Sequence, residues 1–444
     1  MKDLNVIVVG AGIGGLQTAL ALAERGFKVT VLEAVQEFTE VGAGIRVPPN
    51  SNLLSKSWGV DFGQISKNVS CGNRFVDWKG KPLLDIPFEQ DLVSKYGAPY
   101  YFLHRADLMN LLLETAQSKP NIEVRFGCKV VRYDFETTSV QLENGQTVQS
   151  DLIVCADGIK SAIRDLINGE PCPPLDTGDV AYRILVPAAP LLEDPKMSHL
   201  VTEAWATHWI GPSAHAVGYP LRGGELYNII IDITHETDPS PPLSFSDWMQ
   251  KHSNTELLQR FSDWCPEVKA ILSLTGTYLK WKLADFDQLK TWVHPSNRAV
   301  LLGDSCHPMM PYLAQGAAQA TEDAACLAAC LSHFSSLGAA LKQYQQQRKP
   351  RAAYIARNTR VLQEWWHVHD GPLKDKRDQL MGSTDEDNPM FWGCSKRRDW
   401  LFGHDASTIG EPRSVADGIP DLPPEVKPED SVYQRARHEL STNP

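Results

Sequence analysis

The sequence of 444 residues lacks three features that would each identify a class of protein: long apolar runs, a surplus of basic residues and internal repeats. No stretch reaches the roughly 18 apolar residues of a transmembrane helix, so we expect no membrane span. Lys and Arg number 43 against 54 Asp and Glu, which gives a formal net charge of −11. Because binding to nucleic-acid phosphates requires concentrated positive charge, this balance excludes a nucleic-acid partner.

The sequence also lacks paired cysteines and clustered metal ligands. None of the nine cysteines belongs to a Cys-x-x-Cys pair, and no group of His, Cys, Asp and Glu residues has metal-site spacing. We therefore predict reduced cysteines, a cytoplasmic location and no bound metal. The composition that remains, 42% hydrophobic and 22% charged, is that of a globular protein, and the length predicts two or three structural units.

A βαβ unit opens the chain. An apolar, β-branched run over residues 5–9 predicts a buried strand, residues 13–25 have helical periodicity, and residues 29–32 predict a second strand. The intervening turn contains Gly10, Gly12 and Gly15 in the pattern G-x-G-x-x-G, and Glu33 ends the second strand. Glycines at this spacing let a pyrophosphate approach the helix N-terminus, and the terminal acid can bond ribose hydroxyls. The unit therefore predicts a dinucleotide with a free 2′-hydroxyl, FAD or NAD.

The rest of the chain divides into regions of different texture. An Asn-Gly turn at residues 144–145 predicts a hairpin, alternating strands follow to residue 233, and the stretch from about residue 410 reads as an irregular tail. Helices are expected over residues 108–117, 245–261, 319–333 and 337–364, and further strands over residues 123–126, 130–135, 139–142, 147–148, 151–156, 181–186, 203–210, 215–219, 226–233 and 299–302.

Two further motifs place a carboxylate directly after a buried strand. Asp157-Gly158 follows the strand at residues 151–156, and Gly303-Asp304 follows the strand at residues 299–302. Together with the glycine-rich turn, they resemble the three flavoprotein motifs of the class A flavoprotein monooxygenases of the para-hydroxybenzoate hydroxylase type. Within that class, the chain is most similar to the salicylate hydroxylase-like branch common in fungi, and the motifs span roughly residues 1–330.

This resemblance implies an α/β fold with a Rossmann-like FAD-binding domain, an inserted antiparallel β-sheet substrate domain and a helical C-terminal region. The boundaries we expect are 1–178 for the first part of the FAD-binding domain, 179–295 for the substrate sheet, 296–335 for the return segment, 336–405 for the helical region and 406–444 for a flexible tail.

The resemblance also implies roles for individual residues on the cofactor side. Glu33 binds the FAD ribose, Arg105 reaches the phosphate and ribityl region, and Asp304 bonds the ribityl and pyrophosphate part. Gly44 or Arg46 lies close to the flavin, and Asp157 serves FAD and the transient pyridine nucleotide. The predicted cofactor-binding residues are Gly10, Gly12, Gly15, Glu33, Gly44, Arg46, Arg105, Asp157, Asp304, Pro311, Gly316 and Ala317.

Three residues of the predicted substrate sheet are catalytic candidates. By the resemblance, Arg183 anchors an anionic substrate or steadies the flavin, although a structural ion pair is the alternative. His215 deprotonates a phenol, against the alternative of a hydrogen-bonded histidine at the rim of the sheet. Tyr219 shares a strand face with His215, so both side chains should point into the cavity or neither should.

Other conspicuous residues have plainer interpretations. Trp205 and Trp209 either line the pocket or pack in the core. The basic, glutamine-rich segment 343–351 is expected to be a solvated helix face. His307 is expected to be a structural hydrogen-bonding residue.

The resulting hypothesis is a monooxygenase that hydroxylates a small aromatic, phenolic substrate through a flavin hydroperoxide, in fungal secondary metabolism. It would hold FAD tightly, use NADH or NADPH as transient reductant and O₂ as co-substrate, and act as a monomer or homodimer. The alternatives are epoxidation or oxidative dearomatisation of an indole or polyketide scaffold, an NAD-dependent dehydrogenase, and a flavin-binding protein without enzymatic activity.

Overall fold

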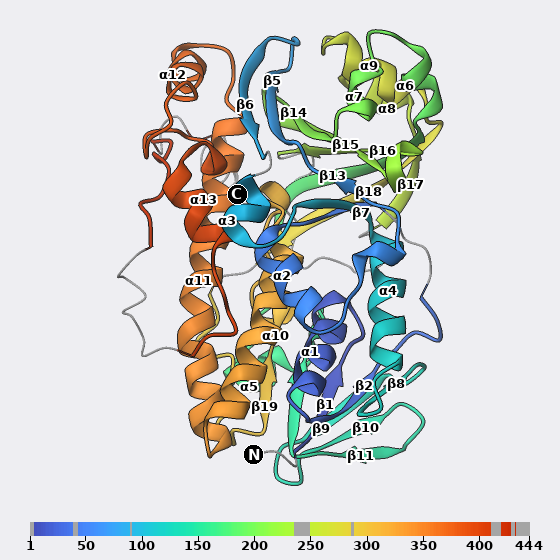
Figure 1. The fold of residues 1–444 in the computed structure, drawn as a ribbon, viewed down its shortest axis with the longest axis vertical. Coiled ribbons are helices and arrows are strands. Elements are labelled where there is room, and N and C mark those ends of the chain that lie inside the picture. The colour runs from blue at the N-terminus through green and yellow to red at the C-terminus, as the bar shows by residue number, and fades with distance from the viewer. Residues whose placement is uncertain are drawn as a thin grey trace, which may run out of the picture.

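Two large sheets occupy opposite ends of the long axis of the molecule, and long helices run along one side (Figure 1). The computed structural model describes residues 4–38, 43–88, 91–234, 249–285, 288–409, 419–427 and 431. One sheet is parallel and has five strands, and the other is mixed and has eight. This arrangement confirms the predicted α/β fold with a Rossmann-like domain and a separate, largely antiparallel sheet.

The parallel sheet has the strand order β19-β12-β1-β2-β8, and every neighbouring pair is parallel. Each strand lies at or within two residues of its position predicted from sequence. The return of β19 to a sheet whose other strands precede residue 156 shows that a large segment is inserted between them. The strands are β1 (Asn5–Val9), β2 (Lys28–Leu32), β8 (Ile122–Arg125), β12 (Leu152–Cys155) and β19 (Ala299–Leu301).

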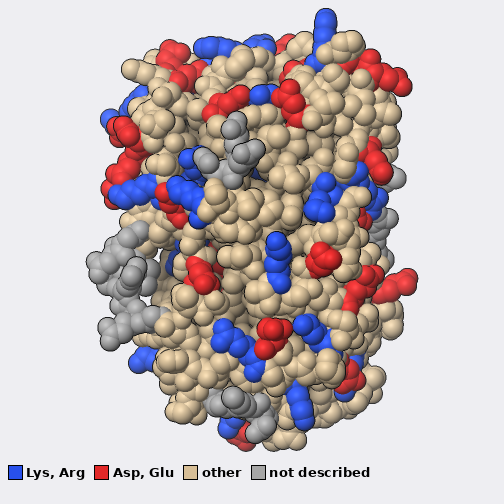
Figure 2. Space-filling model, viewed as in Figure 1, with Lys and Arg blue, Asp and Glu red and all other residues tan. Residues whose placement is uncertain are grey.

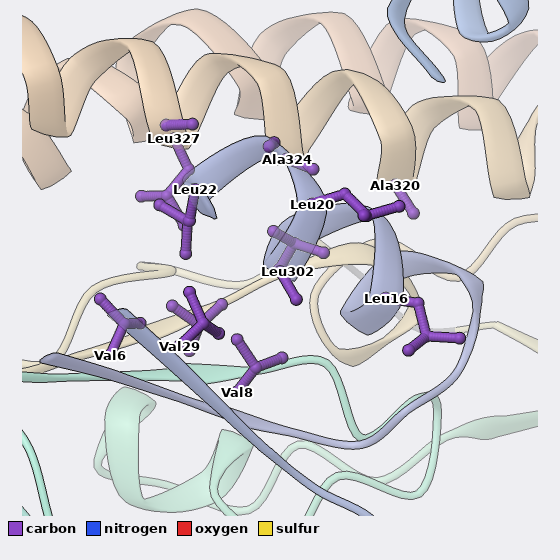
Figure 3. Close-up of a cluster of buried hydrophobic side chains, with 14 of the residues drawn as sticks. Val6, Val8, Leu16, Leu20, Leu22, Val29, Leu302, Ala320, Ala324 and Leu327 are labelled. Carbon is purple, nitrogen blue, oxygen red and sulfur yellow. The ribbon is translucent and has the colours of Figure 1, made fainter. Parts of the chain in front are cut away.

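Helices α1 (Ile13–Glu24) and α10 (Gly316–His333) pack on each other and on the parallel sheet (Figure 3). A Cβ added to Gly14 would lie 3.2 Å from the Cβ of Ala320, so the small residues permit a close approach of the two helices. Full burial of one leucine or valine side chain contributes about 1.5–3 kcal/mol, so this cluster anchors the domain. Buried side chains here include Val6, Val8, Leu16, Leu20, Leu22, Val29, Leu302, Ala320, Ala324 and Leu327.

The eight-stranded sheet has the order β17-β18-β13-β16-β15-β14-β5-β6. All its neighbouring pairs are antiparallel except β14 and β5, which are parallel. Two of its strands, β5 and β6, come from the segment 1–178, so the substrate sheet also recruits chain from before the insertion. The strands are β5 (Gly72–Asp77), β6 (Pro82–Pro87), β13 (Leu175–Pro187), β14 (Trp205–Gly211), β15 (Ala214–Leu221), β16 (Leu226–Ile233), β17 (Met249–Ser253) and β18 (Thr277–Asp285).

The prediction of helical segments around residues 245–261 is confirmed for residues 255–260 and wrong for residues 249–253. Residues 249–253 form β17, which pairs with β18 at the edge of the sheet, and only α8 (Thr255–Arg260) is helical. Residues 245–248 lie outside the described residues. Pairing with an exposed sheet edge satisfies backbone groups that local helical periodicity does not take into account.

Smaller elements connect and cover the two sheets. The strands of the sheet β3-β7-β4 fall between β2 and β8 in sequence. The sheet β11-β10-β9 contains the predicted Asn-Gly hairpin. The strands are β3 (Gly44–Val47), β4 (Asn68–Val69), β7 (Tyr101–His104), β9 (Val130–Asp134), β10 (Ser139–Leu142) and β11 (Thr147–Gln149). The helices are α2 (Pro49–Ser57), α3 (Asp91–Tyr96), α4 (Arg105–Gln117), α5 (Arg164–Asn168), α6 (Ala189–Glu193), α7 (His199–Thr202) and α9 (Pro266–Ser273).

The C-terminal region is helical, as expected, with α11 (Leu337–Trp366), α12 (Pro372–Leu380) and α13 (Ser395–Phe402). Part of the stretch expected as a tail is described, and it lies against α11 without forming a helix or strand. The Tyr354 hydroxyl donates to the carbonyl oxygen of Pro420 at 2.7 Å, and the Trp365 indole donates to that of Pro424 at 2.5 Å.

The interpretation of residues 343–351 as a solvated helix face is wrong for its two arginines. Arg348 and Arg351 are 1% and 4% exposed and face α10, where Glu322 and Asp323 are fully buried. Arg348 donates to Asp323 at 2.7 Å and to Glu322 at 2.6 Å, and Arg351 donates to Glu322 at 2.7 Å. We call these four residues the α10–α11 ionic cluster. Their acidic partners lie 25 to 29 positions away in sequence, so a local reading of α11 does not show them.

The surface carries mixed charge. Figure 2 shows acidic and basic side chains interspersed over the displayed face. No helix in the described part of the chain combines the length and apolar character needed to cross a bilayer.

Candidate active site

A cavity of about 720 Å³ lies where the carboxyl ends of β1, β2, β12 and β19 face the eight-stranded sheet. Ligands of open parallel sheets bind at this edge, where the loops after the strands leave a crevice. Side chains of the second sheet close the cavity from the other side, so both predicted units contribute to it. Every predicted site residue except Gly15 lines this cavity.

The glycine-rich turn forms one end of the cavity. Gly10 has a φ of +97°, and a Cβ on it would lie 2.6 Å from the carbonyl oxygen of Ala156. A Cβ on Gly12 would meet nothing within 4 Å, so the backbone there faces open space in front of the N-terminus of α1. Gly15 packs instead against β1, because a Cβ on it would lie 1.9 Å from the carbonyl oxygen of Gly10. This turn fits a pyrophosphate, which the free N–H groups of α1 can bind.

Glu33 is fixed beside that turn. Its carboxylate accepts hydrogen bonds from the backbone N–H of Ala11 at 2.7 Å and of Val35 at 3.1 Å. A carboxylate has about four lone-pair positions, so two contacts leave capacity for ribose hydroxyls. The residue therefore fits the ribose-binding role predicted for it.

Asp304 and Arg105 bring opposite charges to the middle of the cavity. Asp304 makes no hydrogen bond or ion pair with the described residues, and its side chain is accessible from the cavity. The surrounding protein raises the pKa of Asp304, while the charges of His307 and Arg105 act in the opposite direction. Burial lowers the pKa of Arg105, and Asp304 counteracts this. An unpartnered carboxylate that is accessible from a deep cavity fits the polyol of a ribityl chain.

The loop after Asp304 is shaped for a planar group. Pro311 is exposed on the cavity wall, and Ala314 has a φ of +51°, a left-handed conformation that is uncommon for residues other than glycine. Helix α10 then begins at Gly316, so the free N–H groups of Gly316 and Ala317 are available at the cavity. These donors fit the carbonyl edge of an isoalloxazine.

Asp157 provides a further unpartnered acceptor. One of its carboxylate oxygens accepts from the backbone N–H of Ala162 at 3.3 Å, and Oδ1 is buried with no partner in the described residues. Burial raises the pKa of this carboxyl, and the nearby Ser161 and Arg164 side chains oppose the effect. The open turn at Gly12, the Asp304 carboxylate and this oxygen give the cavity polar groups that are available to a ligand. The residues of this side of the cavity therefore fit FAD.

The opposite wall comes from one face of the eight-stranded sheet. Cross-strand register places His215 of β15 opposite Asp232 of β16, and Tyr219 opposite Asn228. Because side chains alternate across a strand, His215, Val217 and Tyr219 share a face, and all three line the cavity. Gly44 allows Tyr219 to lie close to β3, since a Cβ on Gly44 would come within 2.5 Å of the tyrosine ring.

Arg183 of β13 lies on the same face. Its guanidinium lies over the Trp281 ring, 4.6 Å from the centroid, and its Nε has no hydrogen-bond partner in the described residues. Burial lowers the pKa of Arg183, the charge of Arg105 lowers it further, and Asp232 raises it. Burial likewise raises the pKa of Asp232 to about 7, against the opposing effect of Arg183. Arg183 therefore forms no ion pair within 4.0 Å of a carboxylate among the described residues, and this disfavours the alternative of a structural ion pair.

His215 is buried and connected away from the cavity. Burial is the main cause that lowers the pKa of His215 far below its usual value, so the ring is neutral at pH 7. Its Nδ1 lies 2.9 Å from Nε2 of His367, and Nδ1 of His367 lies 2.6 Å from the Thr234 hydroxyl. Gln363 donates both to Thr234 at 2.9 Å and to Asp179 at 2.7 Å. A chain of polar groups thus leads from His215 to α11.

Sequence reasoning missed several residues of this wall. Asp232 and Trp281 line the cavity, and the register of β16 and β18 with their neighbours is what brings them there. Trp366 also lines the cavity and His367 contacts His215, and no role was predicted for either residue from the sequence. Alternation along β16 could have indicated Asp232, because it is the one carboxylate among the branched residues of that strand.

Trp205 and Trp209 do not line the cavity. Trp209 is fully buried in a separate hydrophobic cluster and donates to Glu267 at 3.0 Å, and Arg74 lies over the Trp205 ring at 4.6 Å. The core alternative is therefore right for Trp209.

Cys306, His307 and Asp323 bring three potential metal ligands within 4.8 Å of one another. The oxygens of Asp323 already accept from Arg348, from the backbone N–H of Gly303 and from His307 at 2.5 Å. His307 therefore acts as the structural hydrogen-bonding residue that was expected, and the adjacent cation disfavours a metal ion.

Comparison with known proteins identifies the chain's relatives. Residues 3–359 match the family described as FAD binding domain. The FAD-dependent monooxygenase OpS4 of Beauveria bassiana is 32% identical over 92% of this chain and 97% of its own length. The 3-hydroxybenzoate 6-hydroxylase 1 of Aquipseudomonas alcaligenes is 31% identical over 90% of this chain and 97% of its own. A salicylate hydroxylase in a substrate complex has the same fold, with a TM-score of 0.74 at 23% identity over 91% of this chain and 96% of that one.

Proposed function

The chain belongs to the FAD binding domain family and is an FAD-dependent monooxygenase, and from this premise we propose that it hydroxylates a small phenolic substrate at the expense of NADH or NADPH. One observation carries the proposal. His215, Arg183 and Tyr219 open into the same cavity as the loops that fit FAD. The base, the cation and the cofactor site therefore face a common space.

The residues that would hold FAD follow from the site. The turn at Gly10 and Gly12 with the N-terminus of α1 receives the pyrophosphate, and Glu33 receives the adenosine ribose. Asp304 and Arg105 receive the ribityl and phosphate region, and the N-terminus of α10 receives the flavin ring. When bound, FAD supplies the redox chemistry, taking electrons from NAD(P)H and activating O₂ so that one oxygen atom enters the substrate.

The protein's own contribution begins with a proton transfer. A phenolate is a better partner for electrophilic oxygen than a phenol, so removal of the phenolic proton promotes the reaction. In the tautomer that acts as a base, Nδ1–H of His215 donates to Nε2 of His367, and Nε2 of His215 carries a lone pair. His215 accepts the phenolic proton on Nε2 and passes its Nδ1 proton to His367. His367 thereby removes the positive charge from the base at the cavity wall.

Arg183 acts on the negative charge that the proton transfer leaves on the phenolate oxygen. A guanidinium whose Nε is unpartnered at the cavity wall can donate to the phenolate oxygen and stabilise it. Asp232 lies close to both His215 and Arg183. Its carboxylate is 3.6 Å from Nε2 of His215, and its charge raises the pKa of Arg183. Tyr219 provides a hydroxyl on the same face and completes the polar wall.

The similarity to a 3-hydroxybenzoate 6-hydroxylase supports a phenolic substrate. A place in fungal secondary metabolism is part of the same proposal; it rests on the resemblance to the salicylate hydroxylase-like branch, and the relative from Beauveria bassiana is itself an FAD-dependent monooxygenase. The proposal also includes a cytoplasmic location, because all nine cysteines are free. The family membership speaks against the alternative of an NAD-dependent dehydrogenase, which also gives Asp304 and the loop beyond it no role.

The test uses the holoenzyme and His215→Ala. With 3-hydroxybenzoate as the first phenol tried, substrate-dependent NAD(P)H oxidation and hydroxylated product should appear in the wild type. The variant should lose about 10²-fold or more in kcat and retain its flavin spectrum, because general-base catalysis contributes about 10²–10⁴-fold. His199→Ala, at a half-exposed histidine outside the cavity, is the matched control. Unchanged turnover in His215→Ala would remove the base from the mechanism. Absence of flavin bands after reconstitution with FAD would overturn the function itself.

A further inference from the structure

Arg46 of β3 is a buried cation without a carboxylate partner. Its side chain lines the cavity, yet the residue is only 7% exposed. Its single hydrogen bond to a described residue joins Nη1 to Oδ1 of Asn73 at a long 3.3 Å. A guanidinium has five N–H donors, so most of the hydrogen-bonding capacity of Arg46 is unused.

The other buried arginines of the described chain are all better satisfied, and Arg164 donates to the backbone carbonyls of Cys172, Ile159 and Ser305. Arg348 and Arg351 share the carboxylates of the α10–α11 ionic cluster, and Arg377 donates to Asp378 at 2.7 Å. Arg397 donates to three backbone carbonyls, of Asp421, Asn388 and Glu386. Because buried charges in proteins are paired or hydrogen-bonded, the exception at Arg46 indicates that its partner is a ligand.

The neighbours of Arg46 are mostly hydrogen-bond donors that also lack acceptors. The Asn73 amide nitrogen and the indole nitrogen of Trp392 are buried and have no hydrogen-bond partner among the described residues. The Trp392 ring centroid lies 5.8 Å from the Arg46 guanidinium carbon. The Tyr100 hydroxyl, which is close enough to feel the Arg46 charge, is also buried and unpartnered. Nδ1 of His208 is the one unpartnered acceptor among these neighbours. None of these four neighbours lines the cavity, so they form donor-rich surroundings behind the Arg46 guanidinium, which does line it and is complementary to an anionic oxygen.

These neighbours belong to the substrate side of the molecule. Asn73 and His208 lie on β5 and β14 of the eight-stranded sheet, where Asn73 Oδ1 also contacts His208 Nε2 at 3.1 Å. Tyr219, over which the Arg46 guanidinium carbon lies at 5.9 Å, is on β15 of the same sheet. The residues that fit the nucleotide, Glu33 and Asp304 among them, lie at the ends of the parallel strands instead.

The geometry points to Arg46 as the anion-binding residue of the substrate site, which takes a carboxylate or a comparable anionic oxygen on the aromatic substrate. This assignment rests on the proposed function and narrows it to acidic aromatic substrates. It also revises the cofactor-side role predicted for Arg46, by directing the guanidinium to the substrate.

The experiment is a binding titration and does not depend on turnover. The oxidised holoenzyme is titrated with 3-hydroxybenzoate and with its neutral analogue 3-hydroxybenzamide, and the change in flavin absorbance gives each Kd. The wild type should bind the acid more tightly than the amide. Arg46→Gln should weaken binding of the acid about 10- to 100-fold and change binding of the amide less than about threefold, because charge-assisted hydrogen bonds are the stronger class. The Kd of Arg46→Lys for the acid should lie between those of the wild type and Arg46→Gln, because lysine retains the charge but lacks the planar guanidinium.

Arg74→Gln is the matched control. Arg74 is the residue after Asn73 on β5, so its side chain points to the opposite face of the sheet, where it pairs with Asp85 at 3.1 Å. This control should leave both Kd values unchanged. Wild-type enzyme without a preference for the acid, or equal weakening of both ligands in Arg46→Gln, would overturn the assignment. If Arg46→Gln loses FAD but still prefers the acid over the amide, Arg46 binds the cofactor and not the substrate. Tight binding of the acid without NAD(P)H-dependent oxidation would count against the proposed function and leave the anion site standing.

Discussion

The α10–α11 ionic cluster and the cavity wall are two charged regions that differ in whether their charged groups have partners in the protein. In the cluster, each carboxylate and each guanidinium has partners at 2.6–2.9 Å. At the cavity, Arg46 has one long contact, Nε of Arg183 has none, and Asp304 makes no hydrogen bond or ion pair with the described residues. Arg46 is 7% exposed and Arg351 is 4% exposed, so burial alone does not explain why one has partners and the other does not.

The difference separates charges that hold the fold from charges kept for ligands. The charges of Arg351 and Arg348 outweigh the effect of burial and hold the pKa of Glu322 well below its usual range. At the cavity, burial prevails and raises the pKa of Asp304 and Asp232. A carboxyl with a depressed pKa has found its partners in the protein, and one with a raised pKa has not.

Breaking the cluster should have the largest effect. Arg348→Met leaves Glu322 and Asp323 short of a partner in a fully buried position, and removal of one member of a buried ion pair costs about 3–5 kcal/mol. Chemical denaturation should therefore show a loss of this size in the free energy of unfolding. Arg357→Met removes an exposed arginine of the same helix that pairs with Glu425, and it should cost less than about 1 kcal/mol. Equal losses in the two variants would show that the cluster contributes no more to the free energy of unfolding than an exposed ion pair does.

Asp304→Ala tests a cavity carboxylate that lies close to the cluster in sequence and in space. Since Asp304 makes no hydrogen bond or ion pair with the described residues, its removal should leave folding intact and weaken FAD binding about 10- to 150-fold, the equivalent of about 1.5–3 kcal/mol for a hydrogen bond to a charged group. Flavin content after gel filtration and titration of the apoprotein with FAD measure the loss. Retention of a full complement of flavin would count against the role of Asp304.

A smaller, pH-dependent effect is expected from Asp232. Its pKa is raised to about 7, so the carboxyl is neutral below that pH and negatively charged above it. An anion bound near Arg183 should then bind about two- to tenfold less tightly as the pH rises through 7, because a like charge develops close to it. Benzoate is a suitable probe because it stays ionised from pH 5.5 to 9, and Asp232→Asn should abolish the pH dependence. A pH dependence that persists in the variant would assign the titration to another group.

The two regions also differ in how far sequence could predict them. The nucleotide loops were predictable because their residues follow strands within a few positions, as Gly10, Glu33 and Asp304 do, and the chain itself fixes their location. His215 and Tyr219 were predictable as a pair from strand alternation.

What could not be predicted depends on pairing between distant segments. Arg348 looked solvated because Glu322 lies on another helix, and Asp232 and Trp281 reach the cavity only through the register of the sheet. The strand at residues 249–253 exists because a sheet edge pairs with it. The unpartnered state of Arg46 is likewise a property of its three-dimensional neighbours, which no local pattern records.

The most direct test of this account compares the free energy of unfolding of Arg46→Met and Arg348→Met, measured by chemical denaturation of preparations with equal flavin content. Both variants replace a buried arginine with an apolar side chain of similar length. The account predicts that Arg348→Met loses about 3–5 kcal/mol, whereas Arg46→Met stays within about 1 kcal/mol of the wild type. Arg46→Met gives up one long hydrogen bond and two ring contacts at 5.8–5.9 Å, and it removes a cation that has no carboxylate partner among the described residues. A loss in Arg46→Met as large as that in Arg348→Met would contradict the account, because it would make Arg46 a residue that holds the fold.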